Sequence, residues 1–480
     1  MISFGSFQID PRTWLLTSDN KPVDLSSRLV EILGFIIERQ GSIVTKDELL
    51  ERFWPDVHIS DNTLARAIAD IRKALGEDAA APRFLETASR RGYRFIGDKA
   101  SITEASDPFQ DWVKGRLALD SLDSARLNDA VRAFERAAVE LPRYAPAHAG
   151  LANAYLLQYE RTRSVSVPDR GLLTRAMQSA RQATALDPSL GEAWAVLGYL
   201  LSAGGKTEEG QAAARRATAL ESENWRHHYR LAYGTWGEER LRAVERTLAL
   251  MPGFAPARML GSMVFVARGI VDRAEREASI GAEAQRQHRG DRTPLPAVGF
   301  HWLHGMIVAA RGDRETALGC FDEEIAAAET GHVYAREFVV NAHVASGFTM
   351  LAAGNRDIAL AAFTQALTHA SGHPKASVGI FSLAVTSGDE ASIGTSRAAS
   401  EAAIAELTRG ERHVEAALVA AGMQVADGRV DQAIENLDRF LTAAPAGPAG
   451  WIIPVDPMLA AIQGNRGATA LFSRLAARAA

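Results

Sequence analysis

Hydrophobic and polar positions follow two different patterns along the chain, and the change falls near residue 100. Over residues 1–98, short pieces that alternate apolar and polar residues are interleaved with segments of helical periodicity. From residue 109 onward, apolar residues recur at helical spacing, with turn residues roughly every 15–20 positions. The predicted fold class is therefore mainly α: an α+β domain over 1–98, a polar linker over 99–108 and an all-α domain over 109–480.

The most regular helical pattern in the first domain runs from Asp61 to Leu75. Its apolar residues form a single stripe at Leu64, Ile68, Ile71 and Leu75. The other side is polar and has little aliphatic bulk: Asn62, Thr63, Arg66, Asp70 and Lys73. Alone, this pattern is typical of any amphipathic surface helix, so its meaning depends on the neighbouring segments.

The neighbouring segments predict a defined order of elements around this helix. Three β-like pieces, the first at residues 4–9, precede a helix that Ser26 can cap. After a short strand, Thr45 and Glu48 have the spacing of a capping box that begins a second helix. Residues 84–96 follow the Asp61–Leu75 helix and read as a hairpin. This order predicts a winged helix-turn-helix preceded by a small sheet.

Five runs within this order resemble the OmpR/PhoB-type DNA-binding domain: Asp24-Leu25-Ser26-Ser27, Thr45-Lys46-Asp47-Glu48-Leu49-Leu50, Phe53-Trp54-Pro55, Ile71-Arg72-Lys73-Ala74-Leu75-Gly76 and Gly92-Tyr93-Arg94-Phe95. The resemblance covers residues 3–97 with near-usual spacing. It implies that the Asp61–Leu75 helix lies in the DNA major groove and that the hairpin tip reaches the adjacent minor groove.

The polar side chains of this helix and hairpin fall into three groups, according to the DNA surface that each can reach. Those suited to base edges are Asn62, Arg66 and Asp70. Those suited to phosphates are Thr63, Arg72, Lys73 and Tyr93. The wing tip holds Ser89, Arg90 and Arg91, and relatives often carry an arginine where this chain has Ser89. Two roles stay open for Asp70: an ion pair with Arg66, which we favour, or a hydrogen bond from a cytosine amino group.

The resemblance also implies a protein contact beside the second helix. Trp54 and the loop that holds Asp56 and His58 occupy the place where relatives touch RNA polymerase. The alternative, which we favour for Trp54, is that its indole packs in the domain core.

Charge is distributed unevenly and favours a local contact with nucleic acid over a general one. The net charge is −5; residues 1–61 carry six basic against ten acidic residues, whereas residues 62–97 carry seven against four. Because few phosphates would be neutralised per copy, we expect modest affinity and two copies on DNA, as in a homodimer. The chain shows no run of 18 apolar residues, no secretory signal and a single cysteine, Cys320, which together predict a cytoplasmic protein.

The segment from 109 to 480 resembles tetratricopeptide-repeat proteins, whose unit of about 34 residues is a pair of antiparallel helices. A second-helix pattern recurs, first at Ala130, Phe134 and Ala137. Small residues at helix crossings would let backbones approach, with large side chains beside them, namely Phe134, Phe321 and Phe363. We expect about 8–10 repeats in a superhelix, in one lobe or two, with residues 374–410 helical but without a clear register.

The first helices of these repeats would line the inner face of the superhelix. Their exposed positions are mostly aromatic or apolar: Asn153, Tyr199, Tyr229, Tyr233, Trp236, Met263, Trp302, Met306 and Phe348. One interpretation is a groove for a partner helix or a small amphipathic effector. The other, given equal weight, is that these residues pack between adjacent repeats.

Residues suited to catalysis, cofactor binding or metal binding do not form a recognisable pattern. The run Ala203-Gly204-Gly205-Lys206-Thr207 has Leu200 where a phosphate-binding loop needs its first glycine, and His301 and His304 lack a third metal ligand. We therefore expect no enzyme activity, no metal and no cofactor. The sequence predicts a bacterial one-component transcriptional regulator that binds promoter DNA and is not anchored in a membrane. The alternative is a repeat scaffold or adaptor whose winged helix binds protein.

Overall fold

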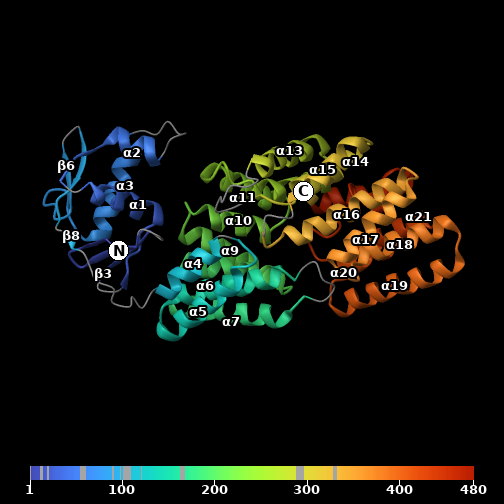
Figure 1. The fold of residues 1–480 in the computed structure, drawn as a ribbon, viewed down its shortest axis with the longest axis horizontal. Coiled ribbons are helices and arrows are strands. Elements are labelled where there is room, and N and C mark those ends of the chain that lie inside the picture. The colour runs from blue at the N-terminus through green and yellow to red at the C-terminus, as the bar shows by residue number, and fades with distance from the viewer. Residues whose placement is uncertain are drawn as a thin grey trace. The chain divides into compact units, whose positions relative to one another are not determined.

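The computed structural model describes residues 2–10, 14–18, 21–39, 41–53, 61–88, 91–97, 99–100, 110–120, 122–162, 168–287, 297–327 and 332–480. The chain forms two compact units, Met1–Val113 and Lys114–Ala480. Figure 1 shows the fold of both. The first is an α+β unit and the second is almost entirely helical, so the predicted fold class is confirmed.

The first unit opens with an antiparallel sheet in the order β4-β3-β2-β1-β8. The strands are β1 (Ile2–Phe4), β2 (Phe7–Asp10), β3 (Leu15–Ser18), β4 (Lys21–Pro22) and β8 (Lys99–Ala100). The stretch 4–9, read from the sequence as one β piece, is a hairpin, because Gly5 takes a left-handed turn conformation with φ of 54°. Residues 99–100, expected in the linker, instead pair with β1. The pairing is made by main-chain hydrogen bonds, so no hydrophobic pattern in the sequence predicts it.

Three helices follow, each bounded largely as the sequence predicts: α1 (Ser27–Glu38), α2 (Lys46–Phe53) and α3 (Asp61–Leu75). Ser26 caps α1 by accepting from the Leu29 amide. The capping box is confirmed, since the Thr45 amide donates to Glu48 Oε2 at 2.8 Å and the Glu48 amide donates to Thr45 Oγ1 at 3.2 Å.

A second sheet in the order β5-β7-β6 closes the first unit and forms the predicted wing. Its strands are β5 (Val44–Thr45), β6 (Leu85–Ala88) and β7 (Gly92–Phe95). Gly92 is required where β7 pairs with β5, because a Cβ at this position would lie 1.9 Å from the Val44 carbonyl oxygen. The sheet packs with α1 and α3 around a common core.

The second unit is a succession of antiparallel helix pairs, as expected for tetratricopeptide-like repeats (Figure 1). After α4 (Gln110–Asp120), the helices are α5 (Leu127–Glu140), α6 (Ala145–Glu160), α7 (Arg170–Leu186), α8 (Gly191–Ala203), α9 (Thr207–Leu220), α10 (Trp225–Gly234), α11 (Gly237–Leu250), α12 (Pro256–Ala267), α13 (Val271–Gln287), α14 (Phe300–Ala310), α15 (Arg314–Ala326), α16 (Ala335–Ala352) and α17 (Arg356–His369). The repeat number and the division into lobes stay predictions.

Phenylalanine side chains seated against glycine hold the helix pairs together. A Cβ on Gly305 of α14 would lie 2.6 Å from a ring carbon of Phe321 on α15, and one on Gly347 of α16 would lie 2.5 Å from Phe363 on α17. Both rings are fully buried. The predicted combination of small residues at crossings and large residues beside them is therefore confirmed.

The segment without a clear register, residues 374–410, is a helix pair, α18 (Pro374–Ser387) and α19 (Glu390–Arg409). The chain ends with α20 (His413–Ala426), α21 (Val430–Ala443), the short helices η2 (Pro457–Leu459), α22 (Ala460–Gln463) and η3 (Arg466–Ala468), and α23 (Thr469–Arg478). No helix in the described ranges is long and apolar enough to span a membrane.

Contacts between distant segments draw the repeat unit together. Arg170 at the start of α7 pairs with Glu411 at 2.8 Å, and Arg268 Nε donates to the Ala479 carbonyl at 2.7 Å. The Val333 amide donates to the Leu122 carbonyl at 3.0 Å. These bonds join residues that lie more than 200 positions apart, so they depend on the curvature of the whole array.

Candidate nucleic-acid interface

Helix α3 presents one buried and one exposed face. Its apolar stripe, at most 1% exposed, faces the core: Leu64, Ile68, Ile71 and Leu75. Arg66, Asp70 and Lys73 are exposed on the other side, together with the small residues Ala65 and Ala69. A face with short side chains between longer polar ones lets a helix backbone approach base edges in a major groove. The exposed face therefore has the shape and chemistry of a DNA-reading surface.

The predicted ion pair between Arg66 and Asp70 is wrong for this structure, in which neither described side chain forms an ion pair with the other. The order of the two residues gives a reason, because an acidic residue is better placed N-terminal to a basic one on a helix. Such an exposed pair contributes at most about 0.5 kcal/mol. For Asn62 and Thr63, the structure describes the backbone within the first turn of α3 but not the side chains.

Arg72 and Tyr93 are withdrawn from solvent, contrary to the prediction that they contact phosphates. Arg72 is 9% exposed, and its Nη2 donates at 2.8 Å to both the Leu85 carbonyl and Thr87 Oγ1. Tyr93 is 6% exposed and belongs to the core of the first unit. Both lie where β6 and β7 pack against the helices, so each has packing contacts within the domain.

Glu77, a residue without a predicted role, fixes the turn between α3 and the wing. Its carboxylate accepts from three consecutive backbone amides, those of Arg83, Phe84 and Leu85, at 2.7–3.1 Å. Its Oε1 also lies 4.0 Å from Arg72 Nε. The signal for this role in the sequence is a carboxylate directly after Gly76, the glycine that ends α3. Arg72 and Glu77 together set the position of the wing relative to α3.

The wing carries one described cation that is exposed at its tip, Arg91. The Arg91 carbonyl accepts from the Lys46 amide at 3.3 Å, which ties the wing to the start of α2. Farther along the strand, Arg94 is paired with Glu86. Ser89 and Arg90, the other predicted tip residues, lie outside the described residues, as do Trp54, Asp56 and His58 of the expected polymerase contact.

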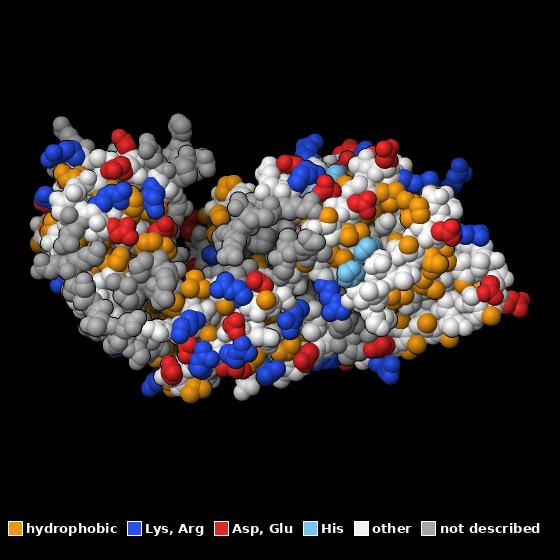
Figure 2. All heavy atoms as spheres, in the orientation of Figure 1, with side chains coloured by type: hydrophobic (Ala, Val, Ile, Leu, Met, Phe, Trp, Pro, Cys, Tyr) orange, Lys and Arg blue, Asp and Glu red, His pale blue; other side chains and the backbone are white. Residues whose placement is uncertain are grey.

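The repeat unit shows charges of both signs on the face seen in Figure 2. On that face, Lys and Arg side chains are interspersed with Asp and Glu over the helices of the unit. A surface of mixed charge does not attract the DNA backbone as a basic patch does. The face of the repeat unit seen in Figure 2 therefore offers no basic patch for DNA.

Most of the predicted groove residues of the repeat unit are packing residues. Met306, Phe348 and Trp302 are 2%, 6% and 9% exposed, and their side chains belong to one large core. Phe348 stacks edge-on against Phe363 at 4.9 Å between ring centres, and half-buried Tyr229 does so against Phe254 at 4.8 Å. For these residues, packing between repeats is the interpretation that holds, because superhelix curvature brings neighbouring first helices together.

Asn153 belongs to a buried polar network rather than to a ligand groove. Its Nδ2 donates to Glu192 Oε1 at 3.2 Å, and its Oδ1 accepts from Arg230. Arg116 Nη1 donates to the other carboxylate oxygen of Glu192 at 3.0 Å. Although burial raises the pKa of Glu192, Arg116 and Arg230 outweigh this effect and hold it below the ordinary value. The network links α4, α6, α8 and α10.

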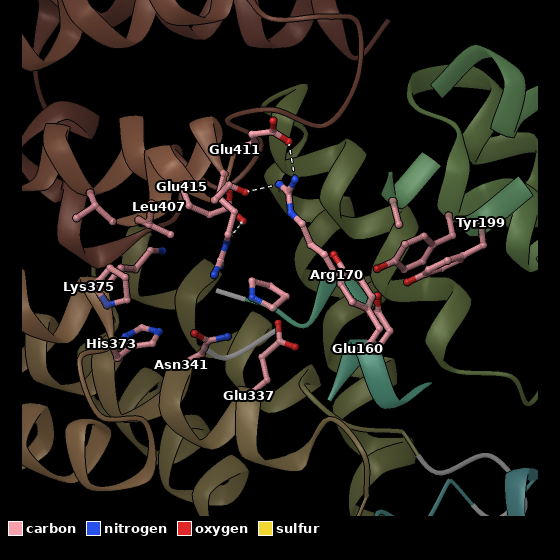
Figure 3. Close-up of a pocket in the computed structure, with 18 residues that line it drawn as sticks. Glu160, Arg170, Tyr199, Glu337, Asn341, His373, Lys375, Leu407, Glu411 and Glu415 are labelled. Atoms are coloured by element: carbon pink, nitrogen blue, oxygen red, sulfur yellow. Dashed lines mark hydrogen bonds and ion pairs between the residues drawn. The ribbon is translucent and has the colours of Figure 1, made fainter. Parts of the chain in front are cut away.

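Of the predicted groove residues, Tyr199 and Tyr233 line a cavity, which has a volume of about 470 Å³ (Figure 3). The remaining wall is largely polar and includes Glu160, Arg170 and Lys375. The expected apolar groove is therefore replaced by a polar cavity. It was not visible in the sequence because its walls come from α6, α7, α8 and α10 and from α16, α18, α19 and α20.

Comparison with known proteins agrees with this geometry in the first unit. Residues 20–95 match the family described as "Transcriptional regulatory protein, C terminal". The first unit is therefore a winged-helix domain of the OmpR/PhoB type.

Similar curated relatives match about a fifth of this chain. The transcriptional activator CadC of Escherichia coli (strain K12) is 23% identical over 97 residues, which cover 20% of this chain and 19% of CadC. The cholera toxin homolog transcriptional activator of Vibrio parahaemolyticus is 34% identical over 120 residues, which cover 22% and 41%. The chain thus spans between about a fifth and two fifths of the length of these relatives.

Solved structures are similar to parts of this chain. The Klebsiella pneumoniae RstA DNA-binding domain in complex with RstA box is 30% identical and covers 20% of this chain and 94% of that chain, with a TM-score of 0.18. TTC0263, a thermophilic tetratricopeptide-repeat protein of Thermus thermophilus, is 18% identical and covers 42% and 99%, with a TM-score of 0.32.

Proposed function

We propose that this protein is a transcriptional regulator that binds double-stranded promoter DNA through its first unit, under control of the repeat unit. The proposal rests on the exposed polar face of α3. Arg72 and Glu77 hold this face beside the wing, and the domain matches the transcriptional-regulator family. The exposed face of α3 suits the major groove, and the wing, with Arg91 exposed at its tip, suits the adjacent minor groove.

The roles of the DNA-facing residues follow from their exposure and chemistry. Arg66 reads a guanine through O6 and N7, and Asn62 reads a neighbouring base from the first turn. Asp70, which is exposed and not paired with Arg66, accepts from a cytosine amino group. Lys73, with Thr63, contacts phosphates, and the wing contributes Arg91 and the adjacent Arg90.

The repeat unit supplies the regulation by binding a ligand or a protein, since a superhelix of this kind offers an internal surface for such partners. Trp54, Asp56 and His58 provide an RNA polymerase contact in an active complex. Two copies on adjacent half-sites would raise the modest affinity of one domain, and the protein acts in the cytoplasm.

Fluorescence anisotropy with the DNA upstream of the gene, at several salt concentrations, tests the proposal. We expect salt-dependent binding by the full chain, and a loss of about 1–3 kcal/mol for Arg66→Ala that is largest on the preferred sequence. Arg90→Ala with Arg91→Ala should weaken binding to all sequences. Lys21→Ala, which removes an exposed charge from the other sheet, is the matched control.

The second candidate function is that of an adaptor whose winged helix binds protein. The exposed carboxylate of Asp70 in the middle of the α3 face, together with the acidic balance of residues 1–61, favours it. The same titration decides between the two functions. If the chain binds no genomic fragment even at low salt, the DNA-binding proposal fails and the adaptor function stands.

A further inference from the structure

The connection between α21 and α23 is much longer than the turns before it. It runs over residues 444–468, whereas α20 and α21 are separated by residues 427–429 alone. Connections of this length are uncommon in compact domains and often carry function. Its central part, residues 451–463, includes η2 and α22 and is called the inserted segment below, because it enters the helical array instead of extending it.

The inserted segment lies against the inner layer of the repeat unit. Helices α14, α16, α18 and α20 form this layer, since each packs against the next. η2 packs against α14, α16 and α20, and Lys375 in the first turn of α18 donates to Asp456 Oδ2 at 2.6 Å. Three predicted groove residues, Trp302, Met306 and Phe348, belong to α14 and α16. The inserted segment therefore occupies the layer where the sequence predicted a groove for a partner.

One buried carboxylate and several apolar side chains make this contact. Asp456 is 3% exposed, and its Oδ1 accepts from the Met458 amide at 3.0 Å. Ile453 and Leu459 are fully buried in the large core of the unit. Met458 reaches α20, where a Cβ on Gly422 would lie 2.6 Å from its sulfur. Apolar anchors combined with one charged anchor are the chemistry by which a helical surface recognises a segment of another protein.

Helix α23, which follows the inserted segment, is held to α21 by bonds of its own. Arg478 donates to the Leu441 and Ala444 carbonyls at 2.9 and 3.0 Å, and Arg474 makes two hydrogen bonds to Asp438 at 2.7 and 3.1 Å. In Figure 1, the chain end that α23 leads to is marked C. Residues that favour turns border the inserted segment on both sides: Pro445, Gly447, Pro448, Gly450, Gly464 and Gly467. The inserted segment can thus leave the inner layer while α23 stays on α21.

We propose that the inserted segment is an internal ligand of the repeat unit, and that a segment of a partner protein replaces it on the inner layer. The partner segment has the same chemistry: apolar side chains around one carboxylate, which pairs with Lys375. The inference rests on the proposed function, since it names the kind of partner through which the repeat unit would regulate the first unit. Docking itself does not require DNA, so the two proposals can fail separately.

Tethering sets the threshold for this exchange. A short tether gives the inserted segment an effective concentration on the order of millimolar, so an untethered segment with equal contacts competes poorly. A partner succeeds when it adds contacts outside the inner layer, or when the inserted segment is weakened. Weakening the inserted segment alone therefore exposes the docking site to a simple probe.

A fluorescent peptide of residues 449–465 is this probe, and anisotropy with the full chain measures its binding. We expect little binding to the wild type up to about 100 µM peptide, because the tethered copy competes. Asp456→Asn in the chain removes the partner of Lys375 from the tethered copy only, so this variant should bind the peptide at least about tenfold more tightly. Equal binding by the wild type and Asp456→Asn, or no binding by either, would overturn the proposal.

A second substitution places the binding on the inner layer. Lys375→Met added to Asp456→Asn should remove most of the gain in affinity, because the aspartate of the peptide then has no cation to pair with. Glu435→Gln, which removes an exposed carboxylate from α21, is the matched control and should bind as the wild type. Retention of the full gain in the double variant would overturn the assignment to this surface.

Hydrogen exchange of the full chain gives a readout that needs no peptide. In the wild type, the amides of the inserted segment should exchange faster than those of α16 and α20, and in Asp456→Asn faster again by at least about tenfold. Exchange of the inserted segment at the same rate as α16 and α20 in the wild type would show that it is a permanent part of the core. Failure of the chain to bind DNA would instead overturn the proposed function and leave these measurements unaffected.

Discussion

At the scale of single residues, burial separates two neighbouring basic residues of α3. Arg72 is buried and donates to Leu85 and Thr87, whereas Lys73 is exposed. They lie side by side in the sequence, but one position along a helix rotates a side chain by about 100°. The pair therefore offers a matched test of structural and DNA-binding roles.

We expect Arg72→Ala to destabilise the first unit by about 1–3 kcal/mol, because the Leu85 carbonyl and Glu77 lose a buried partner. Lys73→Ala should leave stability unchanged and reduce the salt dependence of DNA binding by about one phosphate contact. Hydrogen exchange of the full chain, read at the amides of α3 and β6, measures the first effect, and anisotropy the second. Unaltered exchange in Arg72→Ala would show that this residue does not anchor the wing.

His373 gives the repeat unit a dependence on pH at another single position. It caps α18 through Nδ1, which accepts from the Ala376 amide at 3.4 Å and so must be unprotonated. Burial, with Lys375 and Arg412, lowers its pKa from 6.5 to about 3. Below about pH 6.5 the unfolded chain thus binds a proton that the folded chain does not, so stability falls as the pH decreases towards 3.

The variant His373→Asn keeps an acceptor for the cap but does not titrate. Between pH 6 and 4, urea unfolding of the full chain should show a weaker loss of stability than in the wild type, by up to about 1.4 kcal/mol per pH unit. His413→Asn, which removes an exposed histidine, is the control. Identical pH slopes for His373→Asn and the wild type would contradict the assignment.

At the scale of elements, the helix pairs depend on glycines that face phenylalanine rings. Two glycines near one of these crossings differ only in surroundings. A Cβ on Gly305 of α14 would lie 2.6 Å from Phe321, whereas one on Gly319 of α15 would meet nothing within 4 Å. Residue type and helical context are the same, so the pair isolates the effect of packing.

Gly305→Ala should destabilise the repeat unit by about 1–3 kcal/mol through overpacking. Gly319→Ala should stabilise it by about 0.5–1 kcal/mol, since alanine loses less backbone entropy in a helix. Thermal unfolding of the full chain followed by circular dichroism compares the two variants. The same sign for both would mean that the ring of Phe321 yields easily and that the crossing is not tightly packed.

At the scale of the whole molecule, the net charge of −5 opposes general attraction to DNA, and within residues 1–97 the positive excess falls in residues 62–97. Binding should then depend on few cations, chiefly Lys73, Arg90 and Arg91. We expect the logarithm of the binding constant to fall with the logarithm of salt concentration with a slope of about −3 per copy, and about −6 if two copies bind. Titrations of one-site and two-site DNA between about 50 and 200 mM salt measure this slope. A slope near zero would exclude phosphate contacts as the source of affinity.

The sequence by itself determined the local elements and their order. The bounds of α3, the capping box of Thr45 and Glu48, the wing hairpin and the glycine–phenylalanine crossings are all visible in it, because each depends on periodicity or on residues a few positions apart. The family resemblance of the first unit rests on the same local patterns.

Only the tertiary structure decided which side chains are accessible and which distant segments meet. It buried Arg72, Tyr93, Met306 and Phe348, left Arg66 and Asp70 unpaired with each other, and added β8 to the first sheet. It also brought Glu160, Glu337 and Arg170 around one cavity. These outcomes depend on how curvature accumulates over many repeats and on main-chain pairing across the chain, and neither is encoded in the periodicity of any single segment.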